Sequence, residues 1–143
     1  MRRLLGMLWA SPNTLLGLAL GALGLPFGTR VAAAEGTLQF LGHPMMTWLP
    51  ARAITFGHCV LYRRGTGPDD LAPRYDGQGS QRIGDHERAH VRQYERWGPL
   101  FLYVYLLSAL KPGIHWMERQ ADRWAEGPPP SRKEGPSSER TIT

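Results

Sequence analysis

Apolar residues are concentrated near the amino end, where residues 4–25 contain one polar interruption at residues 11–14. Counted whole, this stretch of about 22 residues is long enough to cross a hydrocarbon core of about 30 Å as a helix. Counted after the interruption, residues 15–27 have the length of a signal-peptide core, and residues 32–34 (Ala-Ala-Ala) resemble a cleavage site. The pattern predicts an apolar membrane anchor or signal segment over residues 1–30, with a buried helix of a soluble fold as the alternative.

The arginines around this segment favour one orientation of an anchor. Arg2 and Arg3 precede the apolar stretch, and only Arg30 follows it closely. Because positive charge is retained on the inner side of a membrane, the amino terminus is expected inside and the remaining domain on the exterior face. Cleavage of a signal segment would instead give a secreted protein.

Alternating polar and apolar residues predict two strands after this segment. Residues 36–41 place Leu38 and Phe40 on one face, and residues 53–64 alternate over their whole length. Pro44 and Pro50 flank the linker between them. We expect a short antiparallel sheet that needs a helix across one face to be stable.

The second half of the chain begins with a loop and continues with three helical stretches. Residues 65–81 are rich in Gly, Pro, Asp, Ser and Gln and predict a long loop, either a functional flap or a disordered excursion. Helices are predicted over residues 83–97, 100–110 and 115–126, because each stretch ends at Gly or Pro. Residues 100–110 are apolar all round but too short to span a bilayer, which predicts a buried hairpin partner or a membrane-dipping segment. Residues 127–143 are rich in Pro and Ser and predict a disordered tail.

Composition narrows the class of protein. The 143 residues suffice for one small domain, and the 17 glycines and 12 prolines make its core shorter than the chain. The single cysteine, Cys59, excludes an intrachain disulfide, a cysteine-rich zinc ribbon and a Cys-x-x-Cys redox motif. The formal net charge of +5 is spread without a basic block interleaved with aromatic residues, so we expect no nucleic-acid partner.

The sequence His86-Glu87-Arg88-Ala89-His90 forms an HExxH motif inside a predicted helix. Because four residues make about one helical turn, both imidazoles leave the same face and can share one cation. Gln93 and Trp97 fall on the same face, while the arginines at 88, 92 and 96 fall on the far side. Glu87 lies where a carboxylate can reach a metal-activated water without being a ligand. The alternative to a metal site is that both histidines are ordinary polar residues of a helix whose hydrogen bonds are satisfied.

A third ligand is available in the last predicted helix. Glu118 and Asp122 lie one turn apart, so the first can bind zinc while the second accepts the N–H of a ligating histidine. Short turns around residues 100–110 allow this helix to return to the HExxH helix. An ordinary charged surface helix is the alternative.

HExxH followed by Glu-x-x-Ala-Asp resembles the gluzincin metallopeptidases, and within them the group of CAAX prenyl endopeptidases and HtpX-type membrane proteases. The resemblance covers residues 83–126, about a third of the chain. It implies a small α+β zincin-like domain over residues 36–126, one zinc ion per chain held by His86, His90 and Glu118, and Asp122 in support. It also implies hydrolysis of a peptide or protein substrate, with Glu87 as the general base.

Several points stay open at this stage. His115, Tyr94 and Tyr103 are candidates to stabilise an oxyanion, each of them also explicable as a structural residue, and His58 lies on a strand that could border the cleft. The competing classes are a non-catalytic, membrane-anchored interaction protein with a structural zinc and a helical interaction domain without metal. The sequence leaves the oligomeric state unknown.

Overall fold

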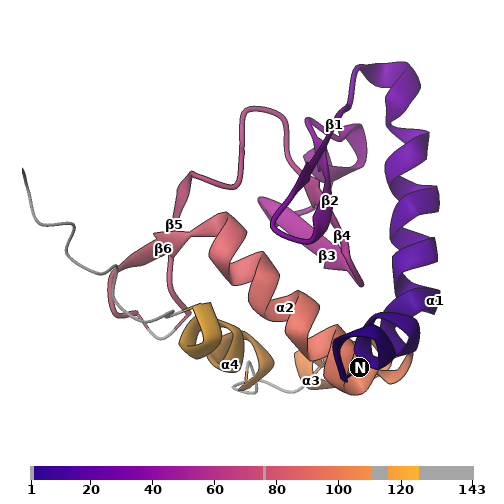
Figure 1. The fold of residues 1–143 in the computed structure, drawn as a ribbon. Helices are drawn as coiled ribbons and strands as arrows, with labels where there is room; N and C mark the ends of the chain where they lie inside the picture. Colours follow the sequence, from indigo (N-terminus) through magenta and orange to yellow (C-terminus); the bar gives the residue numbers. More distant parts are fainter. Residues whose placement is uncertain (1, 76, 111–115, 126–143) are drawn as a thin grey trace, which may run out of the picture.

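The computed structural model describes residues 2–75, 77–110 and 116–125, and its architecture is α+β (Figure 1). The helices are α1 (Arg2–Leu23), α2 (Ile83–Trp97), α3 (Leu100–Ala109) and α4 (Trp116–Ala125), with 3₁₀ turns η1 (Leu25–Phe27) and η2 (Pro44–Thr47). The strands are β1 (Arg30–Ala34), β2 (Thr37–Leu41), β3 (Ala53–Phe56), β4 (Cys59–Tyr62), β5 (Leu71–Pro73) and β6 (Ser80–Arg82). The helices predicted over residues 83–97 and 100–110 are confirmed to within one residue at each end, and α4 lies within the third predicted range. The predicted limits at 115 and 126 and the tail 127–143 lie outside the described residues.

Helix α1 continues through the polar interruption, with Pro12 inside it. A proline removes one backbone donor from a helix, but here neighbouring side chains bind the carbonyls of the preceding turn. Ser11 Oγ donates to Leu8 O at 2.7 Å, and Thr14 Oγ1 donates to Ala10 O at 3.2 Å. The segment Leu4–Phe27 is long and apolar enough for a membrane anchor or a signal sequence.

The main sheet is mixed, so the prediction of an antiparallel sheet was wrong in part. Its strand order is β1-β2-β4-β3, with β2 and β4 parallel and the two outer pairs antiparallel. Strand β1 was missed because its Ala-rich sequence does not alternate, yet Ala33 pairs with Leu38 across a turn at Glu35 and Gly36. Both turn residues have positive φ, of 54° and 79°. This turn type matches the twist of an antiparallel hairpin.

Residues 53–64 form a hairpin rather than the single predicted strand. Gly57 and His58 make a two-residue turn between Phe56 and Cys59. Gly57 has a φ of +59°, and a Cβ there would lie 2.2 Å from Thr14 Oγ1, so glycine is required twice over. The alternating pattern continues through the two turn residues, so nothing in it marks the point at which the chain reverses.

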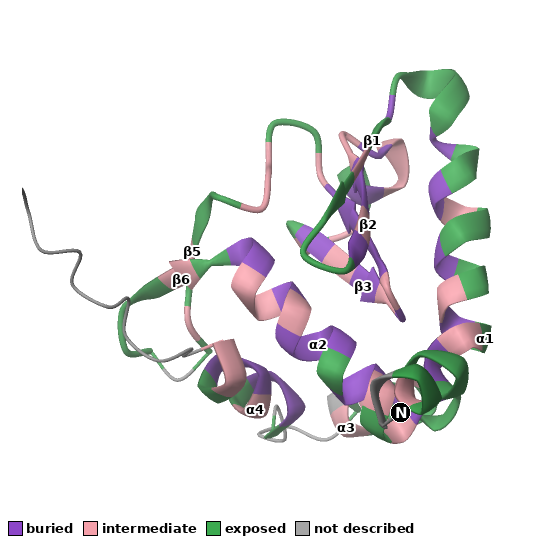
Figure 2. Ribbon diagram, viewed as in Figure 1, coloured by how far each residue is buried: buried purple, intermediate pink, exposed green. Residues whose placement is uncertain are grey.

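Helices cover both faces of this sheet. Leu20 of α1 packs on one face, against a cluster that contains Phe40, Cys59 and Leu61. Ile83 of α2 packs with Val60 and Tyr62 of the opposite face. The α2 helix therefore lies between the sheet and α4, and Figure 2 shows its buried positions along the middle of the molecule.

The predicted loop over residues 65–81 contains a short hairpin, β5–β6, in which Ala72 pairs with Gln81. It is joined to the start of α2 by backbone bonds from Ile83 N to Asp70 O and from Gly84 N to Pro68 O, both at 2.9 Å. These bonds hold the hairpin at the amino-terminal end of α2, close to the HExxH motif.

Candidate metal centre

Helix α2 carries both histidines of the HExxH motif on its inner face. Asp85 in the first turn and Arg96 in the last turn complement the helix dipole, and Gly98 ends the helix. The inner face is buried against the sheet and α4, while Arg92 and Arg96 on the far side are exposed. The side chains of His86 and His90 are only 12% and 10% exposed.

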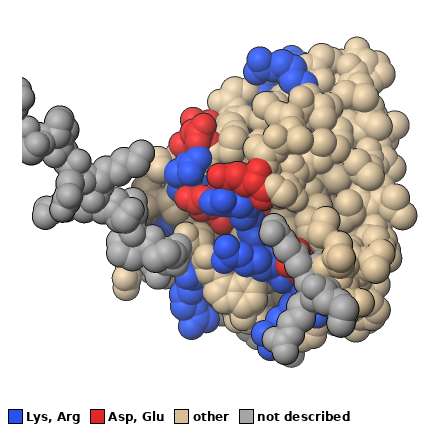
Figure 3. Space-filling model, in the orientation of Figure 1, with Lys and Arg blue, Asp and Glu red and all other residues tan. Residues whose placement is uncertain are grey.

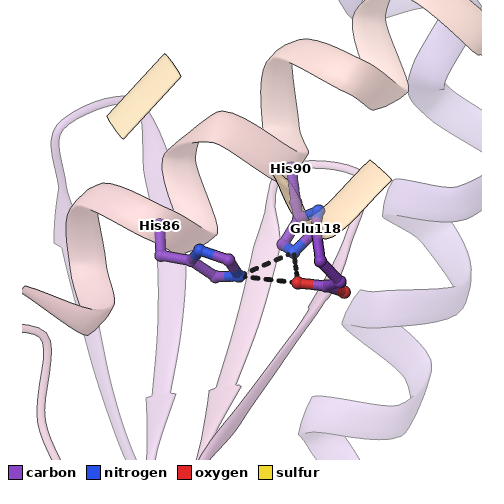
Figure 4. Close-up of side chains that lie close together, drawn as sticks. All are labelled: His86, His90 and Glu118. Atoms are coloured by element: carbon purple, nitrogen blue, oxygen red, sulfur yellow. Dashed lines mark hydrogen bonds and ion pairs between the residues drawn. The ribbon is translucent and has the colours of Figure 1, made fainter. Parts of the chain in front are cut away.

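Glu118 of α4 meets the two histidines, as Figure 4 shows. Its Oε2 lies 3.0 Å from His86 Nε2 and 3.4 Å from His90 Nε2, and the two Nε2 atoms are 3.1 Å apart. The Glu118 side chain is 4% exposed. These three residues can hold a metal ion, because each directs one ligand atom to a common point.

Hydrogen bonds on the far side of each imidazole fix which ring nitrogen carries a proton. His90 Nδ1 lies 2.8 Å from Gln93 Oε1, and Gln93 Nε2 donates to Met117 O, also at 2.8 Å. His86 Nδ1 lies 3.0 Å from Asp122 Oδ1. In neutral histidines both Nδ1 atoms are therefore the donors, which leaves two Nε2 lone pairs facing a carboxylate. Three acceptors that converge in this way need a cation or added protons between them.

The pKa values of His90 and Glu118 also indicate that positive charge is needed between these residues. Burial by itself would lower the pKa of His90, but hydrogen bonding to Glu118 and the charge of Glu118 outweigh it and raise that pKa to about 9. Burial would raise the pKa of Glu118, whereas hydrogen bonds from His86 and His90 lower it well below its usual range. The centre therefore attracts positive charge.

Asp122 connects the β5–β6 hairpin to the histidines. It is fully buried, and its Oδ2 accepts a hydrogen bond from Tyr75 N at 2.7 Å. Its Oδ1 accepts from Gln81 Nε2 and lies against His86 Nδ1. The Tyr75 ring stacks on the His86 ring, with centroids 5.9 Å apart and planes 20° apart. Asp122 therefore links the hairpin to His86.

Glu87 is buried beneath the hairpin and bound to the sheet. Thr55 Oγ1 of β3 donates to Glu87 Oε2 at 2.6 Å. Glu87 and His86 together line a cavity of about 380 Å³ between β3, the β5–β6 hairpin and the start of α2. The rest of the lining is largely apolar and includes Ala53, Ala72 and Ile83.

Sequence reasoning missed Tyr105, Tyr75, Gln81 and Thr55. The Tyr105 hydroxyl donates to Glu118 Oε1 and fixes the carboxylate from the side opposite the histidines. Tyr105 lies in the apolar stretch whose uniform pattern gave no inner face, and Tyr75 and Gln81 lie in the predicted loop. Their roles depend on tertiary packing and left no periodic signal in the sequence.

The other candidates from the sequence lie elsewhere or have structural partners. Tyr94 donates to Thr55 O at 2.9 Å, and Tyr103 faces solvent on α3. His58 lies 3.1 Å from Glu95 and away from the three ligand residues, so it does not border the cavity beside His86. His115 lies outside the described residues. Comparisons of the chain with protein-family models, curated proteins and solved structures found no match.

Proposed function

We propose that this protein is a zinc-dependent peptide hydrolase of the gluzincin type. The observation that carries the proposal is the spacing of the three ligand atoms, which are 3.0, 3.1 and 3.4 Å apart. Tetrahedral zinc with bonds of about 2.0–2.1 Å separates its ligand atoms by about 3.3 Å. The donor set of two imidazoles and one carboxylate is that of a catalytic site with a position open to water.

Glu87 is the proposed general base. Zinc bound by His86, His90 and Glu118 would lower the pKa of a water molecule and polarise the scissile carbonyl. Glu87 lines the same cavity as His86, so its carboxylate can accept the proton of a water molecule beside the ligand residues. The hydrogen bond from Thr55 holds that carboxylate in place, and Asp122 and Gln93 keep the histidines in the tautomer with free Nε2 lone pairs.

Tyr75 replaces the earlier candidates as the proposed oxyanion donor. Burial, followed by the charges of Glu118 and Glu87, raises the pKa of Tyr75 to about 12, so its phenol stays protonated at neutral pH. Its ring stacks on His86 and lines the same cavity as Glu87. A hydroxyl donor at this position suits the negative charge that develops on the carbonyl oxygen.

The cavity also supports a peptide or protein as the substrate. The cavity has a volume of about 380 Å³ and a largely apolar lining, which fits one apolar side chain beside the reacting carbonyl. Association with a membrane through α1 would place this chemistry at a membrane surface. The expectation from the arginines, that the domain lies on the exterior face, applies only to an anchor that spans the membrane.

The test compares Glu87→Gln with Glu95→Gln, a matched change on the same helix in a residue that pairs with His58. Full-length proteins purified without chelators are analysed for zinc and assayed on a mixed peptide library. We expect about one zinc per chain in both variants, with hydrolysis lowered about 10²–10⁴-fold in Glu87→Gln alone. Full activity of Glu87→Gln would refute the mechanism. Zinc in every protein with no hydrolysis would favour the non-catalytic interaction protein, and absence of zinc the metal-free one.

A further inference from the structure

The two faces of α1 have the reverse of the usual size pattern. The buried face carries small or polar residues, among them Ala10, Asn13, Gly17 and Gly21. The exposed face carries large apolar residues, and Leu8, Leu15 and Leu23 are 64–70% exposed. A helix of a soluble domain places its large apolar residues inward. Helices in lipid place small residues at protein contacts instead.

The small face is held to the body by specific bonds, so α1 cannot rotate its leucines inward. Asn13 Nδ2 donates to Gly98 O at 2.9 Å, His58 N donates to Thr14 Oγ1 at 3.1 Å, and His43 Nε2 lies 3.0 Å from Leu20 O. A Cβ at Gly17 would lie 2.6 Å from Cys59 Cβ, so the sheet contacts the helix backbone itself.

A lipid bilayer fits this exposed face by its chemistry. The sequence between Arg3 and Arg30 contains no Asp, Glu, Lys or Arg. In Figure 3, charged residues gather over the middle and left of the molecule, whereas the right side, where Figure 1 places the long part of α1, shows none. Ala10 shares a buried cluster with Phe101 of α3, and α3 with the residue that follows it exposes further apolar side chains: Leu100, Tyr103, Leu106, Leu107 and Leu110. An exposed apolar surface of this extent marks a membrane or protein contact, and its lack of charge favours the hydrocarbon.

The body of the protein prevents α1 from crossing the bilayer. The His58–Glu95 pair contacts Thr14 in the middle of the helix, and β3, an edge strand of the sheet, contacts the same helix. A spanning helix would bring this ion pair and this edge to the depth of the hydrocarbon, where open sheet edges do not occur. We propose that α1, adjoined by α3, lies in the plane of a membrane with its leucine face inserted from one side, as a monotopic anchor.

The first test is flotation of the full chain with phosphatidylcholine vesicles. The double variant Leu8→Glu/Leu15→Glu is compared with Arg96→Gln/Arg123→Gln, which lowers the net charge by the same two units on exposed residues of α2 and α4. We expect the wild type and the arginine variant to float, and vesicle partitioning of the glutamate variant to fall at least about tenfold with an unchanged circular dichroism spectrum. Equal flotation of all three would overturn the proposal. So would a wild-type dimer that the glutamate changes dissociate and that does not float, because a second copy would then cover the face.

The second test separates an in-plane helix from a spanning one. Cysteines introduced singly at Leu5, Leu16 and Leu23 carry a dithionite-reducible fluorophore, and Arg96→Cys is the aqueous control. Native Cys59 is buried, and burial raises the pKa of its thiol to about 11, so labelling of the wild type sets a low background. With protein added to preformed vesicles, external dithionite should bleach all four sites. Protection of one end of α1 and not the other would show a spanning helix. Neither test uses peptidase activity, so their failure leaves the proposed hydrolase untouched.

Discussion

Asp122→Asn removes one charge and one acceptor from the point where the hairpin and the histidines meet. From the described residues, the two oxygens of Asp122 accept hydrogen bonds from His86 Nδ1 and Gln81 Nε2 on Oδ1, and from Tyr75 N on Oδ2. An asparagine offers one oxygen and one NH₂ group in the same place. Whichever way the amide turns, at least one of these hydrogen bonds to residue 122 is lost.

The less costly orientation keeps the oxygen on His86 and turns the NH₂ group toward Tyr75 N. Losing the hydrogen bond from Tyr75 N and placing an NH₂ group against it destabilises the fold by about 1–3 kcal/mol, and the loss falls on the attachment of the hairpin. Loss of the carboxylate behind a ligating histidine weakens metal binding by about 10–100-fold. We therefore expect Asp122→Asn to unfold at lower temperature and to bind zinc about 10–100-fold more weakly.

Zinc affinity is measured by competition with a chromophoric chelator, and stability by thermal unfolding of the metal-free protein. Asp85→Asn is the matched control, since Asp85 lies on α2 and pairs with Arg82 and Arg88 outside the ligand cluster. Wild-type zinc affinity in Asp122→Asn would refute the argument that this carboxylate orients His86. An equal loss of affinity in Asp85→Asn would show a general electrostatic effect instead.

Three further predictions follow from the same geometry. Tyr105→Phe removes the hydroxyl donor to Glu118 Oε1 and should weaken zinc binding about tenfold, while Tyr103→Phe on the exposed side of α3 should leave it unchanged in the same competition assay. Because the pKa of His90 is raised to about 9 in the metal-free protein, zinc must displace a proton from His90 below that pH. Zinc affinity should therefore rise about tenfold per pH unit between pH 6 and 8 and level off above pH 9. A zinc affinity that does not change with pH would contradict this. Gly17→Leu should destabilise the protein by about 1–3 kcal/mol in chemical unfolding, because its Cβ would meet Cys59 and Phe56, whereas Ala22→Leu on the exposed face should not.

The parts of the structure that were predicted correctly depend on the spacing of residues along a helix and on the Gly and Pro residues that end helices. Glycine and proline end the helices that contain His86 and Tyr105, so their limits agree with the structure. The four-residue spacing of His86 and His90 is a property of any helix, and it placed both rings on one side. Convergence with Glu118 was expected from the short turns around residues 100–110 and from the resemblance, and the structure brings all three residues together.

The remaining features depend on contacts between segments that are distant in sequence. The parallel pairing of β2 with β4 joins strands separated by β3, which no local alternation can reveal. Gly57 has no room for a side chain because Thr14 of a distant helix packs against it. Tyr105, within an apolar run, and Gln81, within a Gly-rich segment, acquire their roles only when α3 and the hairpin pack around α4.

The bond between Asn13 and Gly98 joins residues 85 positions apart, which has a consequence for synthesis on the ribosome. Helix α1 emerges long before the turn that receives its side chain. At about 5–20 residues per second, this interval lasts about 4–17 s. Throughout it Asn13 lacks its final acceptor while the leucine face of α1 is already made, so early delivery to a bilayer or binding by a chaperone would protect the nascent chain from aggregation.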